Sequence, residues 1–121
     1  MQESDMLKRF IYYFLVIEVI THKTFKELDY NARISQLNNI PLRIESSVTE
    51  LLIERQKEAR NLSERFIWCA MLKWQEINDA DITQFKIIKR FRDNIYHGEE
   101  VAETSLPVNS AKRLALKLLR S

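Results

Sequence analysis

The stretch "DITQFKIIKRFRDNIYHG", residues 81–98, decides the fold that this sequence predicts. Its apolar residues recur every three or four positions, which is the period of a helix with one buried face. They are Ile82, Phe85, Ile88, Phe91 and Ile95. Asp79 or Asp81 is expected to cap the start of this helix. Gly98, the only glycine in the chain, suits the left-handed position just past a helix end. We therefore expect a core helix that ends near residue 97.

The residues before this stretch show the same helical spacing. A first helix with a broad apolar face is expected over residues 5–20. A second is expected to start at Thr24, because Glu27 follows three residues later and completes a capping-box pattern. A long helical segment is expected from Leu42. The sequence leaves open whether this segment breaks near residues 61–63, where either end residue could cap a new helix.

The remaining segments fit the same fold class. The run "FIWCAML", residues 66–72, is apolar on all sides and is expected to be the most buried helix. After a loop that contains Pro107, Asn109 or Ser110 is expected to cap the last helix. One glycine and two prolines are too few for the turns of an all-β fold. The sequence therefore predicts an all-α protein, a small bundle of four to six helices.

Length and composition bound the other properties of the chain. Its 121 residues fit one helical domain, with N-terminal helices over 1–40 and the main bundle over 42–120. Cys69 is the only cysteine, so an internal disulfide and a cysteine-based zinc site are excluded. The lone glycine excludes a glycine-rich phosphate loop. The net charge of +2 neither indicates nor opposes a nucleic-acid partner.

Within residues 7–20, an apolar run follows two basic residues, Lys8 and Arg9, in the manner of a signal peptide. Glu18 interrupts it, and no small-residue cleavage site follows. It is also shorter than the roughly 20 residues that span a bilayer. We therefore expect a buried helix in a cytoplasmic protein, with no membrane partner.

Polar residues crowd the end of the predicted core helix. Asp93 and His97 are four positions apart and share a face, so Asp93 could hydrogen-bond the imidazole and fix its tautomer. Arg92 and His97 are five apart, roughly 140° around the helix, so their side chains diverge. They converge only through the length of arginine, through unwinding at Gly98, or through a second molecule. A structural interpretation stays open, because a histidine at a helix end interacts favourably with the helix dipole.

The segment "FRDNIYHGE", residues 91–99, resembles the signature of the HEPN superfamily. That signature is an arginine, usually a polar residue, three variable residues and a histidine. Arg92, Asp93 and His97 fill these places, and the resemblance covers about residues 42–120. It implies a four- or five-helix bundle that forms a homodimer. Many members are metal-independent endoribonucleases of toxin–antitoxin, phage-defence or RNA-processing systems, with two motifs facing each other across the dimer, and no cofactor is expected.

The chemistry of the motif fits this activity. RNA cleavage needs one group that withdraws the 2′-OH proton and another that protonates the leaving 5′-oxygen, and histidine can do either. We therefore expect His97 to act as general acid or base. Arg92 would stabilise the phosphate and the transition state through planar donors, and Asp93 would orient the histidine. Three further residues are expected to contact the RNA: Asn94, Lys89 and Arg90.

The expected partners are RNA, a second copy of the chain, and an antitoxin or nucleotidyltransferase. Members that are paired with a nucleotidyltransferase often carry a tyrosine two positions after the histidine. Glu99 stands there, and Tyr96 does not match, so control through that tyrosine is in doubt.

The alternative is a non-catalytic HEPN-like module that binds RNA, a nucleotide or a protein, with a structural adaptor as a third interpretation. The presence of both Arg92 and His97 favours the enzyme. His22 is expected to lie in a surface loop.

Overall fold

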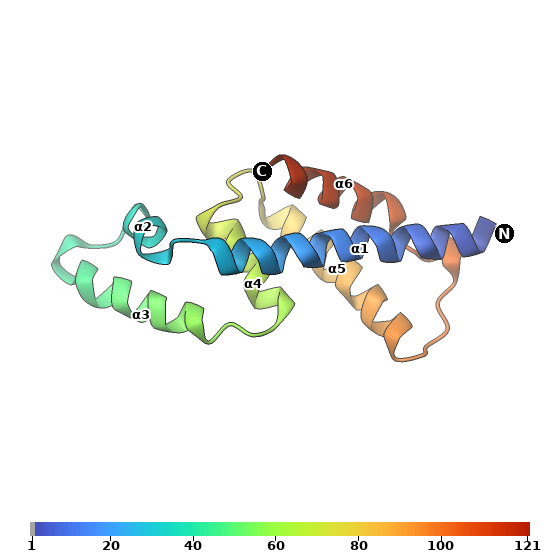
Figure 1. Ribbon diagram of the computed structural model, residues 1–121, viewed down its shortest axis with the longest axis horizontal. Helices are drawn as coiled ribbons and strands as arrows, with labels where there is room; N and C mark the ends of the chain where they lie inside the picture. The colour runs from blue at the N-terminus through green and yellow to red at the C-terminus, as the bar shows by residue number, and fades with distance from the viewer. Residues whose placement is uncertain (1) are drawn as a thin grey trace. The chain divides into compact units, whose positions relative to one another are not determined.

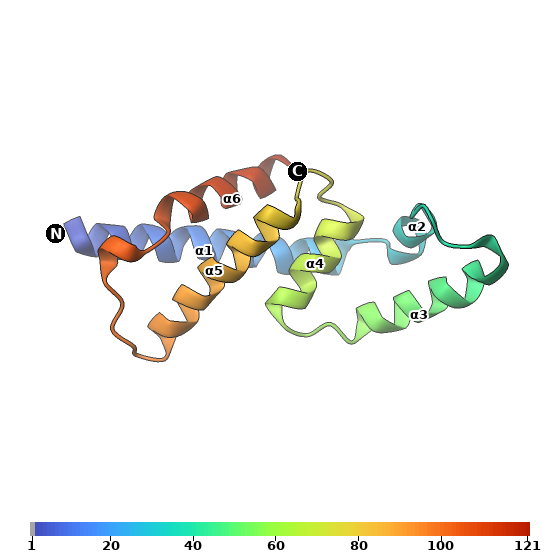
Figure 2. The ribbon, with the colours of Figure 1, turned by 180° about the vertical axis from the view of Figure 1, so that it is seen from behind.

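The computed structural model describes residues 2–121, with side chains from residue 5 onward. This part of the chain contains six α-helices, two short 3-10 helices and no strand, which confirms the all-α prediction (Figures 1 and 2). The elements are α1 (Gln2–Glu27), α2 (Tyr30–Ser35), η1 (Leu42–Ile44), α3 (Glu45–Lys57), α4 (Leu62–Leu72), α5 (Asp79–Tyr96), η2 (Glu103–Ser105) and α6 (Val108–Arg120). None of the described helices is both long enough and apolar enough to cross a membrane.

The helices gather into two compact units, which are described separately. The terminal unit consists of the chain up to Ile20 together with Glu76–Ser121. The central unit consists of Thr21–Gln75. These ranges differ from the segments 1–40 and 42–120 inferred from the sequence, and the single domain stays a prediction.

In the terminal unit, α5 packs beside α6 (Figure 1). Phe85 and Ile88 on α5 are buried, as the spacing of the apolar residues in this helix predicts. The other apolar residues of this stripe, Ile82, Phe91 and Ile95, are half-buried. The buried side chains that α1 and α6 add to this unit are Phe10, Phe14, Ile17, Val108, Ala111, Leu114, Ala115 and Leu118. The core of the unit therefore lies behind the middle of α5 rather than behind its C-terminal end.

α5 starts at Asp79, close to the expected position, but its cap is Asn78 rather than Asp79 or Asp81. The Asn78 side chain accepts the Asp81 backbone N–H at 3.0 Å, and the Asp81 carboxylate accepts the Asn78 N–H at 3.1 Å. This reciprocal capping box satisfies two backbone donors at once, which a cap at either aspartate would not. At the other end, Gly98 has φ +77°, which confirms its left-handed role past the helix.

Asp81 also joins the start of α5 to α6. Its carboxylate, 4% exposed, accepts from Lys117 Nζ at 2.7 Å and from Arg113 Nη1 at 3.2 Å. Burial opposes its charge, but the hydrogen bonds from Lys117, the Asn78 N–H and Arg113 outweigh burial and lower the pKa of Asp81. Asp81 is therefore ionised in the folded protein and holds two helices together.

The last helix also begins earlier than predicted. α6 starts at Val108 directly after Pro107, so Asn109 and Ser110 lie inside the helix and are not its caps. The proline ring holds φ at −80°, close to the helical value, and this lets the helix begin without a side-chain cap.

In the central unit, α1 continues to Glu27, so the predicted helix start at Thr24 is wrong. Thr21 and Phe25 are buried at the spacing that one helical face requires, and continuing the helix keeps both side chains inside. The next helix, α2, is capped by Asp29, whose side chain accepts the Ala32 N–H at 3.2 Å.

The segment from Leu42 contains two α-helices rather than one. α3 ends at Lys57, and Asn61 caps α4 by accepting the Glu64 N–H at 2.8 Å. Residues 66–72, which were expected to form the most buried helix, are buried on one face only, since Ile67 and Met71 are each 44% exposed. The buried face of α4 consists of Leu62, Phe66, Cys69 and Leu72. α4 thus packs through one stripe, as an amphipathic helix does.

Candidate functional site

Arg92 lies near the C-terminal end of α5, with its side chain 19% exposed. Its Nη1 donates to Asp93 Oδ1 at 3.0 Å, and its Nη2 donates to Glu18 Oε2 at 3.1 Å. Glu18 comes from α1 within the same terminal unit. The fold therefore brings a second carboxylate to the arginine, one that the sequence motif did not select.

Two aromatic rings also fix the guanidinium of Arg92. Its Cζ lies 4.3 Å from the ring centroid of Tyr96 and 4.8 Å from that of Phe14. Each such contact contributes about 0.5–1 kcal/mol at an exposed site and more where water is excluded. Phe14 and Glu18 stand one helical turn apart on α1, and so present a ring and a carboxylate on one face. Together they hold the guanidinium in one position.

Asp93 does not orient His97 in the way that the sequence suggested. One carboxylate oxygen accepts from Arg92, and the other accepts from Lys89 Nζ at 2.8 Å. Burial opposes the charge, but the hydrogen bonds from Lys89 and then Arg92 outweigh burial and lower the pKa of Asp93. Within the described residues no hydrogen bond links its side chain to the His97 imidazole, because two cations occupy the carboxylate. Asp93 instead positions Arg92.

His97 ends α5 at an exposed position. Its backbone N–H donates to the Asp93 carbonyl at 3.0 Å. The Gly98 N–H then donates to Ile95 O at 3.1 Å and the Glu99 N–H to Asn94 O at 3.0 Å, which is the Schellman closure of a helix. In the described part of the chain, the imidazole makes no hydrogen bond or ion pair. The backbone of His97 is thus fixed while its side chain faces solvent.

The three predicted RNA contacts, Lys89, Arg90 and Asn94, are divided between the surface and a cluster of charged side chains. That cluster consists of Glu18, Lys89, Arg92 and Asp93. Lys89 belongs to the cluster through Asp93. Arg90 is exposed, and Asn94 is half-buried with its carbonyl engaged in the helix end. The structure therefore joins Arg92, Asp93 and Lys89, while His97 lies one turn further along the same helix and out of contact.

Comparison with known proteins adds no neighbour to this site. No protein-family model matches the chain, and no curated protein or solved structure compared with it matches either. The likeness to the HEPN signature rests on the motif over residues 91–99.

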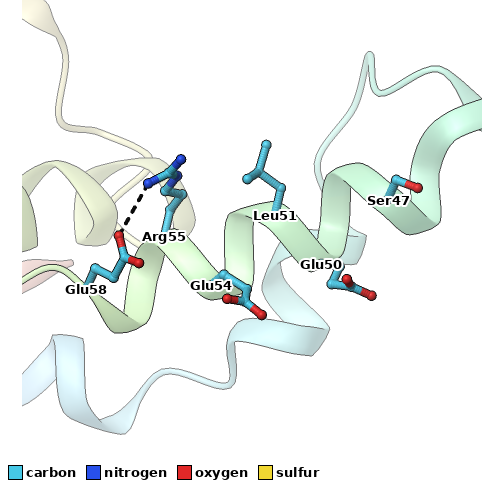
Figure 3. Close-up of a pocket in the computed structure, with 6 residues that line it drawn as sticks. All are labelled: Ser47, Glu50, Leu51, Glu54, Arg55 and Glu58. Atoms are coloured by element: carbon cyan, nitrogen blue, oxygen red, sulfur yellow. Dashed lines mark hydrogen bonds and ion pairs between the residues drawn. The ribbon is translucent and has the colours of Figure 1, made fainter.

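A shallow depression of about 290 Å³ lies away from the motif, on α3 in the central unit (Figure 3). Its lining is Ser47, Glu50, Leu51, Glu54, Arg55 and Glu58. One ion pair crosses it, from Arg55 Nη1 to Glu58 Oε1 at 3.3 Å, and both side chains are mostly exposed. Three glutamates at four-residue spacing form an acidic stripe that disfavours phosphate. Across residues 5–121, no group of three or more His, Cys, Asp or Glu side chains is placed to hold a metal ion.

A second arginine–histidine pair lies in the central unit. The expectation that His22 occupies a surface loop is wrong, because it is half-buried on α1. Arg65 Nη1 lies 3.1 Å from His22 Nδ1, and Arg65 Nε donates to the Ala59 carbonyl at 3.1 Å. The guanidinium is stacked over Phe25 at 4.5 Å. Because arginine only donates, Nδ1 of His22 must accept, which places the imidazole proton on Nε2.

Two titratable groups near this pair are strongly perturbed. Burial raises the pKa of the Cys69 thiol to about 12, although the charges of Lys73 and Arg65 oppose the shift. Burial also raises the pKa of Tyr30 well above its ordinary value. A thiol with this pKa stays protonated and unreactive at neutral pH. Cys69 is therefore a core residue of α4 and not a nucleophile.

Proposed function

We propose that this protein is a metal-independent endoribonuclease of HEPN type that acts as a homodimer, with Arg92 and His97 of each copy in a composite site. The observation that carries the proposal is a guanidinium held in one position one turn before an exposed histidine. The biological role proposed with it is that of a toxin or phage-defence effector in the cytoplasm, with an antitoxin or nucleotidyltransferase as partner.

Arg92 would bind the scissile phosphate. A guanidinium carries five N–H donors, and Asp93 and Glu18 engage two of them. The remaining donors can reach phosphate oxygens while both carboxylates keep the group in place. Because the arginine is already ordered, little reorganisation is needed as charge develops on the phosphorane.

His97 would move the proton. In-line attack of the 2′-OH on phosphorus requires a base on one side and an acid on the other, and one imidazole cannot serve both. A second copy supplies the second histidine. The exposed position of His97 and the fixed helix end that carries it support this arrangement.

The experiment is cleavage of a single-stranded oligoribonucleotide in excess EDTA, with the product ends analysed. Attack by the 2′-OH must leave a 2′,3′-cyclic phosphate, and this product is expected at the same rate with and without chelator. Loss of activity in EDTA with recovery in Mg²⁺ would contradict the mechanism. Sedimentation under the same conditions tests the dimer, since a monomer that still cleaves RNA would overturn the composite site.

One observation favours a non-catalytic binding module as the second candidate. Arg92 and Lys89 are balanced by Glu18 and Asp93, so the cluster has no net charge in this structure. A site of this kind could hold RNA, a nucleotide or a protein without reacting. Binding of RNA in gel-shift assays together with intact RNA after prolonged incubation would favour this function over the enzyme.

A further inference from the structure

Tyr96 is an unusually exposed aromatic residue beside the candidate site. It is the last residue of α5 and is 70% exposed. The Arg92 guanidinium lies 4.3 Å from the centroid of its ring. Arg92 and Tyr96 are four positions apart, so the two side chains share one face of the helix. The ring is therefore ordered by a cation while most of its surface stays in contact with water.

Nucleobases bind to rings that are placed in this way. Unpaired bases of single-stranded RNA stack on aromatic side chains, and the stacking tolerates any base because each has a π-face. The guanidinium of Arg92 contacts the Tyr96 ring, and a base needs only an uncovered part of the ring for stacking. The phosphate of the same nucleotide would then be close to the arginine that contacts the ring.

We propose that Tyr96 is the base-stacking residue of the site and that its ligand is an unpaired nucleotide of single-stranded RNA. This inference rests on the proposed function, because it uses the same Arg92 and His97. It adds a substrate preference, since a base that is paired in a duplex could not stack on this ring. It also gives Tyr96 a second role, base stacking, in addition to its contact with the Arg92 guanidinium.

The chain offers a matched control in Tyr12, which is 62% exposed on α1 and makes an edge contact with Tyr13 at 5.6 Å. The variants are Tyr96→Phe, Tyr96→Leu and Tyr12→Leu. Affinity is measured by fluorescence anisotropy with a labelled oligoribonucleotide that carries 2′-O-methyl groups and cannot be cut. A second oligonucleotide series replaces one base at a time with an abasic site.

Tyr96→Leu should weaken binding by about 5- to 150-fold, the range expected for the loss of one stacked base. The affinity of Tyr96→Phe should stay within about twofold of the wild type, because phenylalanine retains the stacking face. The affinity of Tyr12→Leu should also stay within about twofold, because Tyr12 is not the proposed stacking residue. One abasic position should weaken wild-type binding by a similar factor and should weaken Tyr96→Leu little further. This lack of additivity would identify the stacked base.

Three results would overturn the inference. The first is wild-type affinity in Tyr96→Leu. The second is that Tyr96→Leu weakens binding by the same factor on the intact strand and on every abasic strand, so that the two losses add in full. The third is no measurable binding by the wild type. Failure of the proposed function is read separately, from whether the wild type cleaves the unmodified oligonucleotide. A protein that binds with the predicted pattern but does not cleave would keep the stacking site and lose the nuclease.

Discussion

Arg92 and Arg65 are both half-buried cations that lie over a phenylalanine ring, one in each unit of the chain. Arg65 is joined to a carbonyl oxygen and directly to a histidine, His22. Arg92 is joined to two carboxylates, and its histidine, His97, stays in solvent. The first pair is completed within the chain, whereas the second is ordered but open.

Under the proposed function, this difference separates a structural role from a functional one. A completed contact contributes to the stability of its own unit, and substitution there is expected to change unfolding. An ordered cation near an exposed histidine also stabilises its own unit through its ion pairs and ring contacts, but its remaining donors can act on a second molecule. The predictions below test this contrast, some at the open pair and its neighbours and others at residues whose role is structural.

Among the variants that keep His97, Arg92→Ala is expected to have the largest effect, because it removes the proposed phosphate ligand. Loss of a preorganised donor to a developing anion typically lowers turnover by about 10²–10³-fold. Arg92→Lys should remain impaired, because lysine keeps the charge but not the planar donors. Single-turnover RNA cleavage measures both variants. Turnover by Arg92→Lys near the wild-type rate would show that charge alone is needed.

A pair of aspartates on α5 tests the contrast within one helix. Asp81→Asn should lower the free energy of unfolding by roughly 3 kcal/mol, because it leaves two cations without a buried counter-charge. Asp93→Asn should cost less stability, because its carboxylate is 33% exposed, and should reduce turnover less than Arg92→Ala does. Urea titration and cleavage assays measure both. Equal losses of stability would contradict the distinction.

The same aspartate sets an acid limit on stability. The pKa of Asp81 is lowered in the folded protein, so its contribution is present above the unfolded pKa of about 4 and is lost as pH falls below that value. The wild type should therefore lose stability steeply below about pH 4, and Asp81→Asn should show a shallower acid slope. Thermal midpoints between pH 2 and pH 7 provide the measurement. Parallel slopes for the two proteins would show that Asp81 is not the titrating group.

Arg65→Ala is the counterpart of Arg92→Ala in the central unit. It removes the hydrogen bonds to Ala59 and His22 and the stacking on Phe25, so a loss of about 1–3 kcal/mol is expected. Turnover per folded molecule should be unchanged. A variant of normal stability with reduced turnover would place Arg65 in the functional site instead.

The smallest effect is expected for Cys69, because the reactivity of its thiol tests the packing of the central unit without any substitution. Because its folded pKa is raised to about 12, its contribution to stability is full below the unfolded pKa near 8.5 and falls as pH rises from there to about 12. Alkylation of the thiol at pH 8 should be slow in native protein and fast in urea. Rapid alkylation without denaturant would mean that the thiol is exposed.

The sequence was informative about periodicity and backbone chemistry. The spacing of apolar residues in α5 located the buried Phe85 and Ile88, and Gly98 located the end of the helix. Both signals come from residues that are close together in the sequence, so the sequence alone was sufficient. The predicted helix start at Thr24 and the predicted cap at Asp79 or Asp81 were wrong, since burial of Phe25 and a reciprocal cap from Asn78 outweighed the local signals.

The candidate site was less predictable than the helices. The polar residues at the end of α5 could be selected from the sequence, but their partners could not. Glu18 lies 74 positions before Arg92, and a single sequence gives no signal for a contact at that separation. His22 and Arg65 are 43 positions apart and were missed for the same reason. Side-chain geometry also decided that Asp93 would pair with cations rather than with His97.

The central claim is that His97 moves a proton for RNA cleavage whereas His22 supports the fold, and one paired measurement tests it. Cleavage rate and thermal midpoint are measured for His97→Ala and His22→Ala. His97→Ala should lower the rate by about 10²–10⁴-fold with little change in midpoint, since it removes an acid–base group from an exposed position. His22→Ala should lower the midpoint and leave the rate per folded molecule intact. The opposite pattern, with stability lost in His97→Ala and the rate lost only in proportion, would show that His97 is a structural helix cap.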